Sequence, residues 1–391
     1  MNERDLFIAA RQLDSVEKRR AFLTKACGAD AQLHARVNEL LQAEEQAGSF
    51  LQQPAIAIAS VAGCASDGTA RTQLEGESVA GEAATVSLDF LAPSRLPGSL
   101  GCMGQYEITE FVGSGGMGIV LKANDPKLNR VVAVKVLAPE LGRNATARRR
   151  FMREGQAAAA IAHPHIVTIF AVDEDLLPYL VMEYVDGVSL QEKIDRDGVL
   201  ELKETLRIGT QIAAGLSAAH TQGVIHRDIK PANILLENGV ERVRITDFGL
   251  ARAVDDVAVT RAGEVAGTPQ YMSPEQAQGL PVDARSDLFS LGCVLYAMCT
   301  GRSPFRAESS IASLRRVCDD TPRPIQEVNL DTPEWLSAII SQLLEKLPED
   351  RIQTAAEVAD LLNQHLAHLQ NPSVTPSPQK LVPRRRRRTV T

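Results

Sequence analysis

Features of membrane-spanning, secreted and zinc-binding proteins are missing from this sequence of 391 residues. No stretch reaches the ~18 to 20 consecutive apolar residues that a bilayer-spanning helix needs. The first residues, MNERDLFIAARQ, do not follow the basic-then-apolar order of a signal peptide. The six cysteines form no C-x-x-C pair and no Cys/His set with zinc-ligand spacing. We therefore expect a chain that stays in a reducing compartment, the cytoplasm.

The sequence also lacks a large excess of charge of either sign. Its 42 basic and 49 acidic side chains give a net charge of −7, which argues against a bulk nucleic-acid-binding surface. Hydrophobic residues make up 44% of the chain, enough to build a core and to argue against wholesale disorder. At about 150 residues per domain, the length predicts roughly two to three domains, or one large bilobal domain with appendages.

Composition divides the chain into four parts. Residues 1–51 carry apolar positions at helical spacing and predict a small helical N-terminal region, either a bundle without chemistry or a docking module. Residues 52–103 are rich in Gly, Ser and Ala and poor in large apolar groups, which predicts a flexible linker. Residues 104–369 form the main domain. Residues 370–391 are rich in Pro, Ser and Thr and end in a polybasic run, so we expect a disordered tail.

The main domain changes character along its length. Strands are predicted at Tyr106–Phe111, Ile119–Ala123, Arg130–Leu137 and Tyr179–Glu183. A basic, alanine-rich helix is predicted over residues 145–161. Helical periodicity then dominates from residue 189 to residue 369. A strand-rich part followed by a helix-rich part predicts an α+β fold of two lobes with a crevice between them.

A glycine-rich segment, VGSGGMGIV, joins the first two predicted strands. It contains G-x-G-x-x-G, a weak signal that dinucleotide-binding folds and other phosphate-binding loops share. A dinucleotide fold needs this motif to open a helix, but here Ile119–Ala123 and Arg130–Leu137 predict strands, so the loop is interpreted as a hairpin tip. Such a tip lets the backbone approach a polyphosphate; the alternative is a flexible hairpin without a ligand.

Lys135 is a single cation in an apolar predicted strand, Val-Ala-Val-Lys. A buried ammonium is unfavourable without an anionic partner. A nucleotide phosphate and Glu154 on the following helix are the two candidates. The alternative is an edge-strand lysine that reaches solvent along its own stem.

The most specific segment runs VIHRDIKPANILL and is followed by Asp247-Phe248-Gly249. Magnesium prefers hard oxygen ligands, which Asn233 and Asp247 can supply together with substrate phosphates. Asp228 is then available to orient an incoming hydroxyl and accept its proton, and Lys230 can neutralise charge on a transferred phosphoryl group.

Taken together, these motifs resemble the eukaryotic-like protein kinases, and among them the bacterial serine/threonine kinases, over residues 106–369. The set is the glycine loop, Lys135, Glu154, the His-Arg-Asp segment with Asn233, Asp-Phe-Gly, and Ser273-Pro274-Glu275. The resemblance implies a bilobal protein-kinase fold, with a β-rich N-lobe and a helical C-lobe, and an ATP- and Mg2+-dependent transferase acting on Ser and Thr hydroxyls of proteins in signalling.

Roles follow residue by residue from that resemblance. Asp228 would be the catalytic base, assisted by Lys230, and Lys135 would hold phosphates and pair with Glu154. Asn233 and Asp247 would bind Mg2+. The implied nucleotide-binding residues are Val112, Gly113, Gly115, Gly118, Val120, Ala133, Lys135, Glu183, Val185 and Leu235, with Met182 behind the pocket.

The resemblance also implies structural and regulatory residues. Thr268 would bridge Asp228 and Lys230, and Thr260 is the expected autophosphorylation site in the activation segment, although an exposed loop threonine without that role is the alternative. Asp287 would hold the catalytic-loop backbone.

The same resemblance bears on Glu275, Ser273 and the end of the helix after Glu154. Glu275 would pair with Arg351. Ser273 replaces the family's usual Ala before Pro-Glu, a change between two small residues. The alanine-rich end of the helix after Glu154 predicts that the Lys135–Glu154 pair is loosely held until a ligand or partner orders the helix.

Alternatives remain for the whole chain and its tail. A nucleotide-binding pseudokinase scaffold and an adaptor acting through the N-terminal helices compete with the active kinase, but all the motif residues are present. The five arginines Arg384, Arg385, Arg386, Arg387 and Arg388 fit a solvated tail, an anionic-surface or nucleic-acid contact, or a juxtamembrane stretch of a longer receptor kinase. A homodimer through the N-lobe is expected from relatives, whereas specific nucleic-acid binding is not.

Overall fold

The computed structural model describes residues 87–94, 96–115, 118–238, 242–248 and 269–373. The chain divides into two units, Met1–Ala83 and Ala84–Thr391, and all described residues belong to the second. The predicted N-terminal helices and the polybasic tail lie outside the described residues, and these predictions remain untested.

Two sheets carry the strands. The larger has the order β1-β2-β3-β4-β6-β5 and the smaller the order β7-β8-β9, with antiparallel pairs throughout. The strands are β1 (Gly101–Met103), β2 (Tyr106–Gly115), β3 (Gly118–Asp125), β4 (Arg130–Leu137), β5 (Ile169–Glu174), β6 (Pro178–Glu183), β7 (Gly187–Ser189), β8 (Ile234–Glu237) and β9 (Val243–Ile245).

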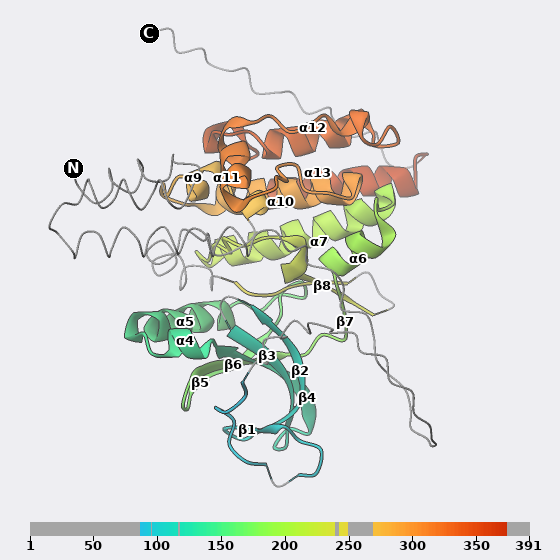
Figure 1. The fold of residues 1–391 in the computed structure, drawn as a ribbon. Helices are drawn as coiled ribbons and strands as arrows, with labels where there is room; N and C mark the ends of the chain where they lie inside the picture. The colour runs from blue at the N-terminus through green and yellow to red at the C-terminus, as the bar shows by residue number, and fades with distance from the viewer. Residues whose placement is uncertain (1–86, 95, 116–117, 239–241, 249–268, 374–391) are drawn as a thin grey trace, which may run out of the picture. The chain divides into compact units, whose positions relative to one another are not determined.

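The helices lie mainly after β7, as the sequence predicts. They are α4 (Pro139–Gly142), α5 (Ala145–Ala159), α6 (Leu190–Asp197), α7 (Leu202–Thr221), α9 (Pro274–Ala277), α10 (Ala284–Thr300), α11 (Ser310–Asp319), α12 (Glu334–Leu343) and α13 (Ala355–Gln370), with short 3-10 turns at Pro231–Asn233, Pro269–Tyr271, Ile325–Glu327 and Pro348–Asp350. Figure 1 shows the curled large sheet with α4 and α5 beside it in one lobe, and α7, α10 and α13 stacked in the other. The two-lobed α+β arrangement is therefore confirmed.

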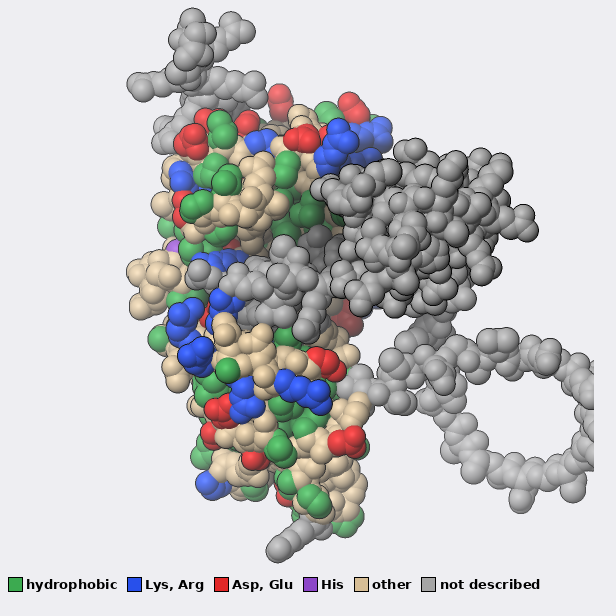
Figure 2. All heavy atoms as spheres, turned by 60° about the vertical axis from the view of Figure 1, so that its left-hand side comes forward, with side chains coloured by type: hydrophobic (Ala, Val, Ile, Leu, Met, Phe, Trp, Pro, Cys, Tyr) green, Lys and Arg blue, Asp and Glu red, His purple; other side chains and the backbone are tan. Residues whose placement is uncertain are grey.

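Helix α5 packs on the sheet of the small lobe. Asn144 begins it, because its side-chain oxygen accepts from the amides of Thr146 and Ala147 at 2.9 and 3.2 Å. Phe151 points inward and packs with Leu137 and Leu180. Arginines occupy the outer side of the helix, and Figure 2 shows blue side chains gathered at mid-height on the face that comes forward from the left of Figure 1.

The large lobe is built around α10, which is buried from Ser286 to Thr300. Asp283 caps its first turn and Gly301, with φ of 73°, ends it in the left-handed conformation that glycine adopts without steric cost. A helix that is buried on all sides needs apolar residues all round. It is surrounded by α7 and α12, with which it shares one hydrophobic core.

The start of the main domain differs from the sequence prediction. The linker was expected to extend to residue 103, but Gly101–Met103 form β1 on the edge of the large sheet. Upstream of β1, three apolar side chains pack against the hydrophobic core of the large sheet; they are Leu88, Phe90 and Leu91. Three apolar side chains within four residues are too few to give a recognisable pattern in the sequence. They are nevertheless enough to pack this short segment on the large sheet.

In the part of the chain that the structure describes, no helix is both long and apolar enough to cross a membrane.

Candidate active site

Lys135 and Asp247 meet across the two lobes. Lys135 lies on β4 and its side chain is buried, and its Nζ is 2.7 Å from Oδ1 of Asp247, which follows β9. Burial opposes ionisation of Asp247, but the adjacent Lys135 ammonium outweighs it and holds the pKa of this carboxyl below its ordinary value. Lys135 was predicted to need an anionic partner, and the structure gives it Asp247, which was not one of the two candidates named from the sequence.

Asp228, Lys230 and Asn233 form one hydrogen-bonded cluster. Lys230 Nζ donates to Asp228 Oδ2 at 2.8 Å, and Asn233 Nδ2 donates to the same oxygen at 2.9 Å and to the Asp228 carbonyl at 2.8 Å. Both described side-chain contacts fall on Oδ2, so Oδ1 is the oxygen on which a hydroxyl can be accommodated. Because the Asn233 amide nitrogen is used, its carbonyl oxygen is the atom it can offer to a cation.

Asp287 on α10 holds the backbone of the loop that leads into Asp228. Its Oδ1 accepts from the Arg227 amide at 2.8 Å, and its Oδ2 accepts from the His226 amide at 2.9 Å. His220 Nε2 lies 2.7 Å from the same Oδ2. Asp287 is completely buried, and the structure confirms the expectation that it holds the catalytic-loop backbone.

His226 links the loop to the residue before Asp247. Its Nδ1 accepts from the Asp228 amide at 3.2 Å, which requires an unprotonated Nδ1. Nε2 therefore carries the proton and donates it to the Thr246 carbonyl at 2.8 Å. The fully buried imidazole thus joins the backbone at Asp228 to the backbone just before Asp247.

The glycine-rich segment is a hairpin, as predicted, with Gly115 paired to Gly118. A Cβ on Gly118 would lie 2.1 Å from the Val136 carbonyl oxygen, so the fold itself requires glycine there. Added Cβ atoms at Gly113 and Gly115 would meet nothing within 4 Å. The described fold gives no reason for glycine at these two positions, whereas close approach of a polyphosphate to the backbone does.

An apolar group lies behind the hairpin. It combines the buried Ala133, Val167 and Met182 with the half-buried Val120, Ile169, Tyr184, Val185 and Leu235. Three of the residues expected to bind the nucleotide, Val120, Ala133 and Leu235, are therefore brought together. Val167 and Ile169 were missed, because the apolar run after Pro164 carries no motif that distinguishes pocket from core. Val112, at a bulge of β2, is 51% exposed and stands apart from this group.

Glu183, at the end of β6, also forms an ion pair. Its Oε1 is 3.0 Å from Arg244 Nη2 on β9, which joins the connection between the lobes to the strand before Asp247. The sequence analysis named Glu183 only as a nucleotide-binding residue and missed this ion pair, since a glutamate at a strand end has no pattern that indicates its partner.

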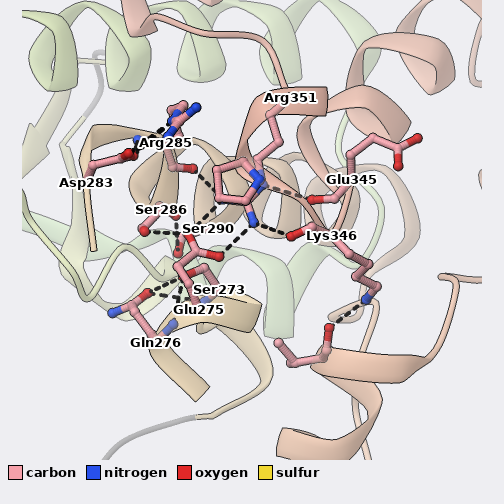
Figure 3. Close-up of polar contacts among 12 residues, drawn as sticks. Ser273, Glu275, Gln276, Asp283, Arg285, Ser286, Ser290, Glu345, Lys346 and Arg351 are labelled. Atoms are coloured by element: carbon pink, nitrogen blue, oxygen red, sulfur yellow. Dashed lines mark hydrogen bonds and ion pairs between the residues drawn. The ribbon is translucent and has the colours of Figure 1, made fainter. Parts of the chain in front are cut away.

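Helix α9 is anchored to the end of the large lobe by an ion pair (Figure 3). Arg351 Nη1 and Nη2 donate to the two oxygens of Glu275 at 2.8 and 2.7 Å, as expected from the sequence. Arg351 has no exposed surface, and its remaining donors bond the carbonyls of Glu345, Lys346 and Arg285. Burial opposes ionisation of Glu275, but bonds from Arg351 and Ser286 hold its pKa below the ordinary value.

Several predicted site residues are not tested by these contacts. Thr260 and Thr268 lie outside the described residues, as does the tip of the glycine hairpin at Gly116 and Met117. Glu154 lies half-buried on α5, and its pairing with Lys135 stays a prediction.

Comparisons with known proteins agree with this geometry. Residues 106–365 match the protein kinase domain family. Serine/threonine-protein kinase PknB of Mycolicibacterium smegmatis is 44% identical over 269 residues, which are 67% of this chain and 43% of that protein. A probable serine/threonine-protein kinase of Clostridium acetobutylicum is 42% identical over 260 residues, which are 66% of this chain and 39% of that protein. The chain thus spans about two fifths of the length of these curated relatives.

A solved structure resembles the described fold. The crystal structure of the Mycobacterium tuberculosis PknI kinase domain superimposes with a TM-score of 0.57 at 29% identity, covering 69% of this chain and 99% of that domain. The sequence family and the fold agree over the region that contains Lys135, Asp228 and Asp247. This chain belongs to the protein kinase domain family.

Proposed function

We propose that the chain is an ATP- and Mg2+-dependent serine/threonine protein kinase. The observation that carries this proposal is the convergence of Asp228, Lys230 and Asn233 with the Lys135–Asp247 pair. In this proposal one carboxylate, Asp228, serves the hydroxyl, and a second carboxylate, Asp247, with the amide oxygen of Asn233 serves a cation. A scaffold without catalysis would have no use for this separation of roles.

The residues fit a magnesium–nucleotide ligand. Asp247 and Asn233 supply hard oxygens, and Mg2+, when bound, neutralises charge on the phosphate oxygens. Lys135 supplies a buried ammonium beside them. Gly113 and Gly115 leave open space along the hairpin backbone, and the apolar group around Ala133 accommodates a planar base.

Asp228 performs the proton transfer in this proposal. It orients the Ser or Thr hydroxyl through Oδ1 and accepts its proton as the hydroxyl oxygen bonds to the γ-phosphorus of ATP, while the bond from that phosphorus to the β,γ-bridging oxygen breaks and ADP leaves. Lys230, 2.8 Å from Oδ2, stabilises negative charge on the transferred group. Of the two classes of hydroxyl, Lys230 with Thr268 favours Ser and Thr over Tyr, and an activation segment between Asp247 and Glu275 favours protein substrates over small molecules.

Self-phosphorylation tests the proposal and its regulation together. The purified chain and its Asp228→Asn variant are incubated with Mg2+ and ATP, then analysed by intact mass and phosphopeptide mapping. We expect phosphate only on the wild type, on Ser or Thr and including Thr260, because a phosphate there can pair with Arg227. Nucleotide binding without any phosphate gain would favour a pseudokinase. An active enzyme whose peptides never carry phosphate at Thr260 would remove that site alone.

Partners and location are also proposed. The proposed substrates are proteins, and the proposed assembly is a homodimer through the small lobe. The proposed location is the cytoplasm, with a membrane-surface contact of residues 384–388. Co-sedimentation with anionic vesicles tests that contact, and failure to bind at every salt concentration would remove it.

A further inference from the structure

The first turn of α9 contains a reciprocal pair, Ser273 and Gln276. The Ser273 amide and Oγ both donate to Gln276 Oε1 at 3.1 Å, and the Gln276 amide donates back to Ser273 Oγ at 3.4 Å. Figure 3 shows the two side chains facing each other below Glu275. This is a capping box, which satisfies amide groups at the start of a helix.

The other end of the Gln276 side chain reaches the catalytic loop. Its Nε2 donates to the Arg227 carbonyl at 2.7 Å, across 49 residues of sequence. The orientation of this amide follows from its partners, because the Ser273 amide can only donate and the Arg227 carbonyl can only accept. Gln276 therefore bridges the end of the activation segment and the residue before Asp228.

Arg227 needs such support. Its φ of 67° lies in the left-handed region, which is unfavourable for a residue with a side chain. Asp287 accepts from the Arg227 amide at 2.8 Å, and Gln276 donates to the Arg227 carbonyl. The peptide groups on both sides of Arg227 are thus held, and the second of them leads directly into Asp228.

We propose that Gln276 is a positioning residue for phosphoryl transfer, which couples α9 to the orientation of Asp228. The inference rests on the proposed kinase activity. Ser273 contributes by holding Oε1, so that Nε2 faces Arg227. The serine that replaces the family's usual alanine therefore belongs to this bridge.

If Gln276 had a purely structural role, its loss would lower the stability of the fold. The positioning role predicts a loss of turnover instead. Glu275 already anchors α9 through its bonds to Arg351 and Ser286, and neither of these involves Gln276. Loss of the Gln276 bridge should therefore leave α9 in place and leave the fold stable. Its effect should appear in turnover, since a small displacement of a catalytic group costs rate rather than binding.

Gln276→Glu is the test variant, because it keeps an oxygen for Ser273 and replaces the donor that faces Arg227 with an acceptor. Gln278→Glu is the matched control, an exposed glutamine at the end of the same helix. In the full chain, we expect Gln276→Glu to lower kcat for a peptide substrate about 10- to 100-fold. The KM for ATP and the thermal midpoint should stay near the wild-type values, and the control should leave kcat unchanged.

Gln276→Leu, which removes both polar ends at similar size, serves as a second variant and also covers the case in which Gln276→Glu fails to fold. We expect it to lower kcat in the same range. An active wild type with unchanged kcat in the folded variants would overturn the inference alone, as would a kcat loss explained entirely by the unfolded fraction. A wild type as inactive as Asp228→Asn would remove the proposed function and this inference with it.

Discussion

The proposed function gives the Asn233 side chain two roles. Its nitrogen donates to the carbonyl and the carboxylate of Asp228, and in the proposal its oxygen binds the cation. A carboxylate at this position could still bind Mg2+ but could not donate to Asp228. The amide is therefore the group that suits both neighbours.

Asn233→Asp should reduce kcat by about 10²- to 10³-fold, in the range measured for removal of one stabilising donor from an active site. The physical reason is that the new carboxylate would face Asp228 Oδ2 in place of a hydrogen bond. Asn238→Asp, whose amide bonds only the surface residue Asp186 at 3.1 Å, is the control. Steady-state peptide phosphorylation at saturating ATP is the measurement, and equal kcat in the two variants would contradict the proposed role.

The sequence identified most residues of the candidate site, but it did not predict many of the side chains that they contact. Lys135, Asp228 and Asn233 stand in motifs whose spacing is informative. The Lys135–Asp247 contact and the Glu183–Arg244 pair join positions far apart in the chain, and only the folded arrangement determines them. Gln276 was missed because a glutamine after Pro-Glu has no chemistry of its own until Arg227 lies opposite.

The short helix α9 is held by one buried ion pair, Glu275 with Arg351. Arg351→Met should cost about 3–5 kcal/mol in the free energy of unfolding at pH 7, because Glu275 would remain buried without its partner. Urea unfolding measures this. Arg315→Met, which removes an exposed pair with Asp319 on α11, should change it by about 0.5 kcal/mol or less.

The same pair predicts a pH dependence. The folded-state pKa of Glu275 lies below its unfolded value of about 4.3, so its stabilising contribution is fully present above that pH and is lost as the pH falls through the folded pKa. The difference in unfolding free energy between wild type and Arg351→Met should therefore shrink below about pH 4. A difference that stays constant to low pH would contradict the assignment.

The segment before β1 is a second element whose contribution can be measured. Phe90 is half-buried against the large sheet, beside Leu88 and Leu91. Phe90→Ala should lower the free energy of unfolding by about 1–2 kcal/mol, less than the 3–5 kcal/mol of a fully buried phenylalanine. Leu96→Ala, at a side chain that is 55% exposed, is the control, and equal unfolding midpoints for the two variants would favour the original linker interpretation.

Across the whole molecule, the lobes are joined at the β6–β7 connection and by a backbone bridge. The Val167 amide donates to the Ile245 carbonyl and the Ile245 amide to the His165 carbonyl, each at 2.9 Å. Lys135 and Asp247 meet beside this bridge. The sequence predicted two lobes with chemistry between them, because strand and helix periodicities occupy separate stretches. It could not predict how far the first lobe extends upstream, since that depends on a few packed side chains.

Transfer of the terminal phosphate of ATP to a protein that offers Ser, Thr and Tyr tests the proposed activity. Wild type, Asp228→Asn and the exposed control Asp331→Asn are compared, with ATP binding measured separately. We predict label on Ser and Thr with wild type and Asp331→Asn, and a rate about 10²- to 10⁴-fold lower with Asp228→Asn at retained ATP affinity. Equal transfer by wild type and Asp228→Asn would contradict the central claim that Asp228 is the catalytic base.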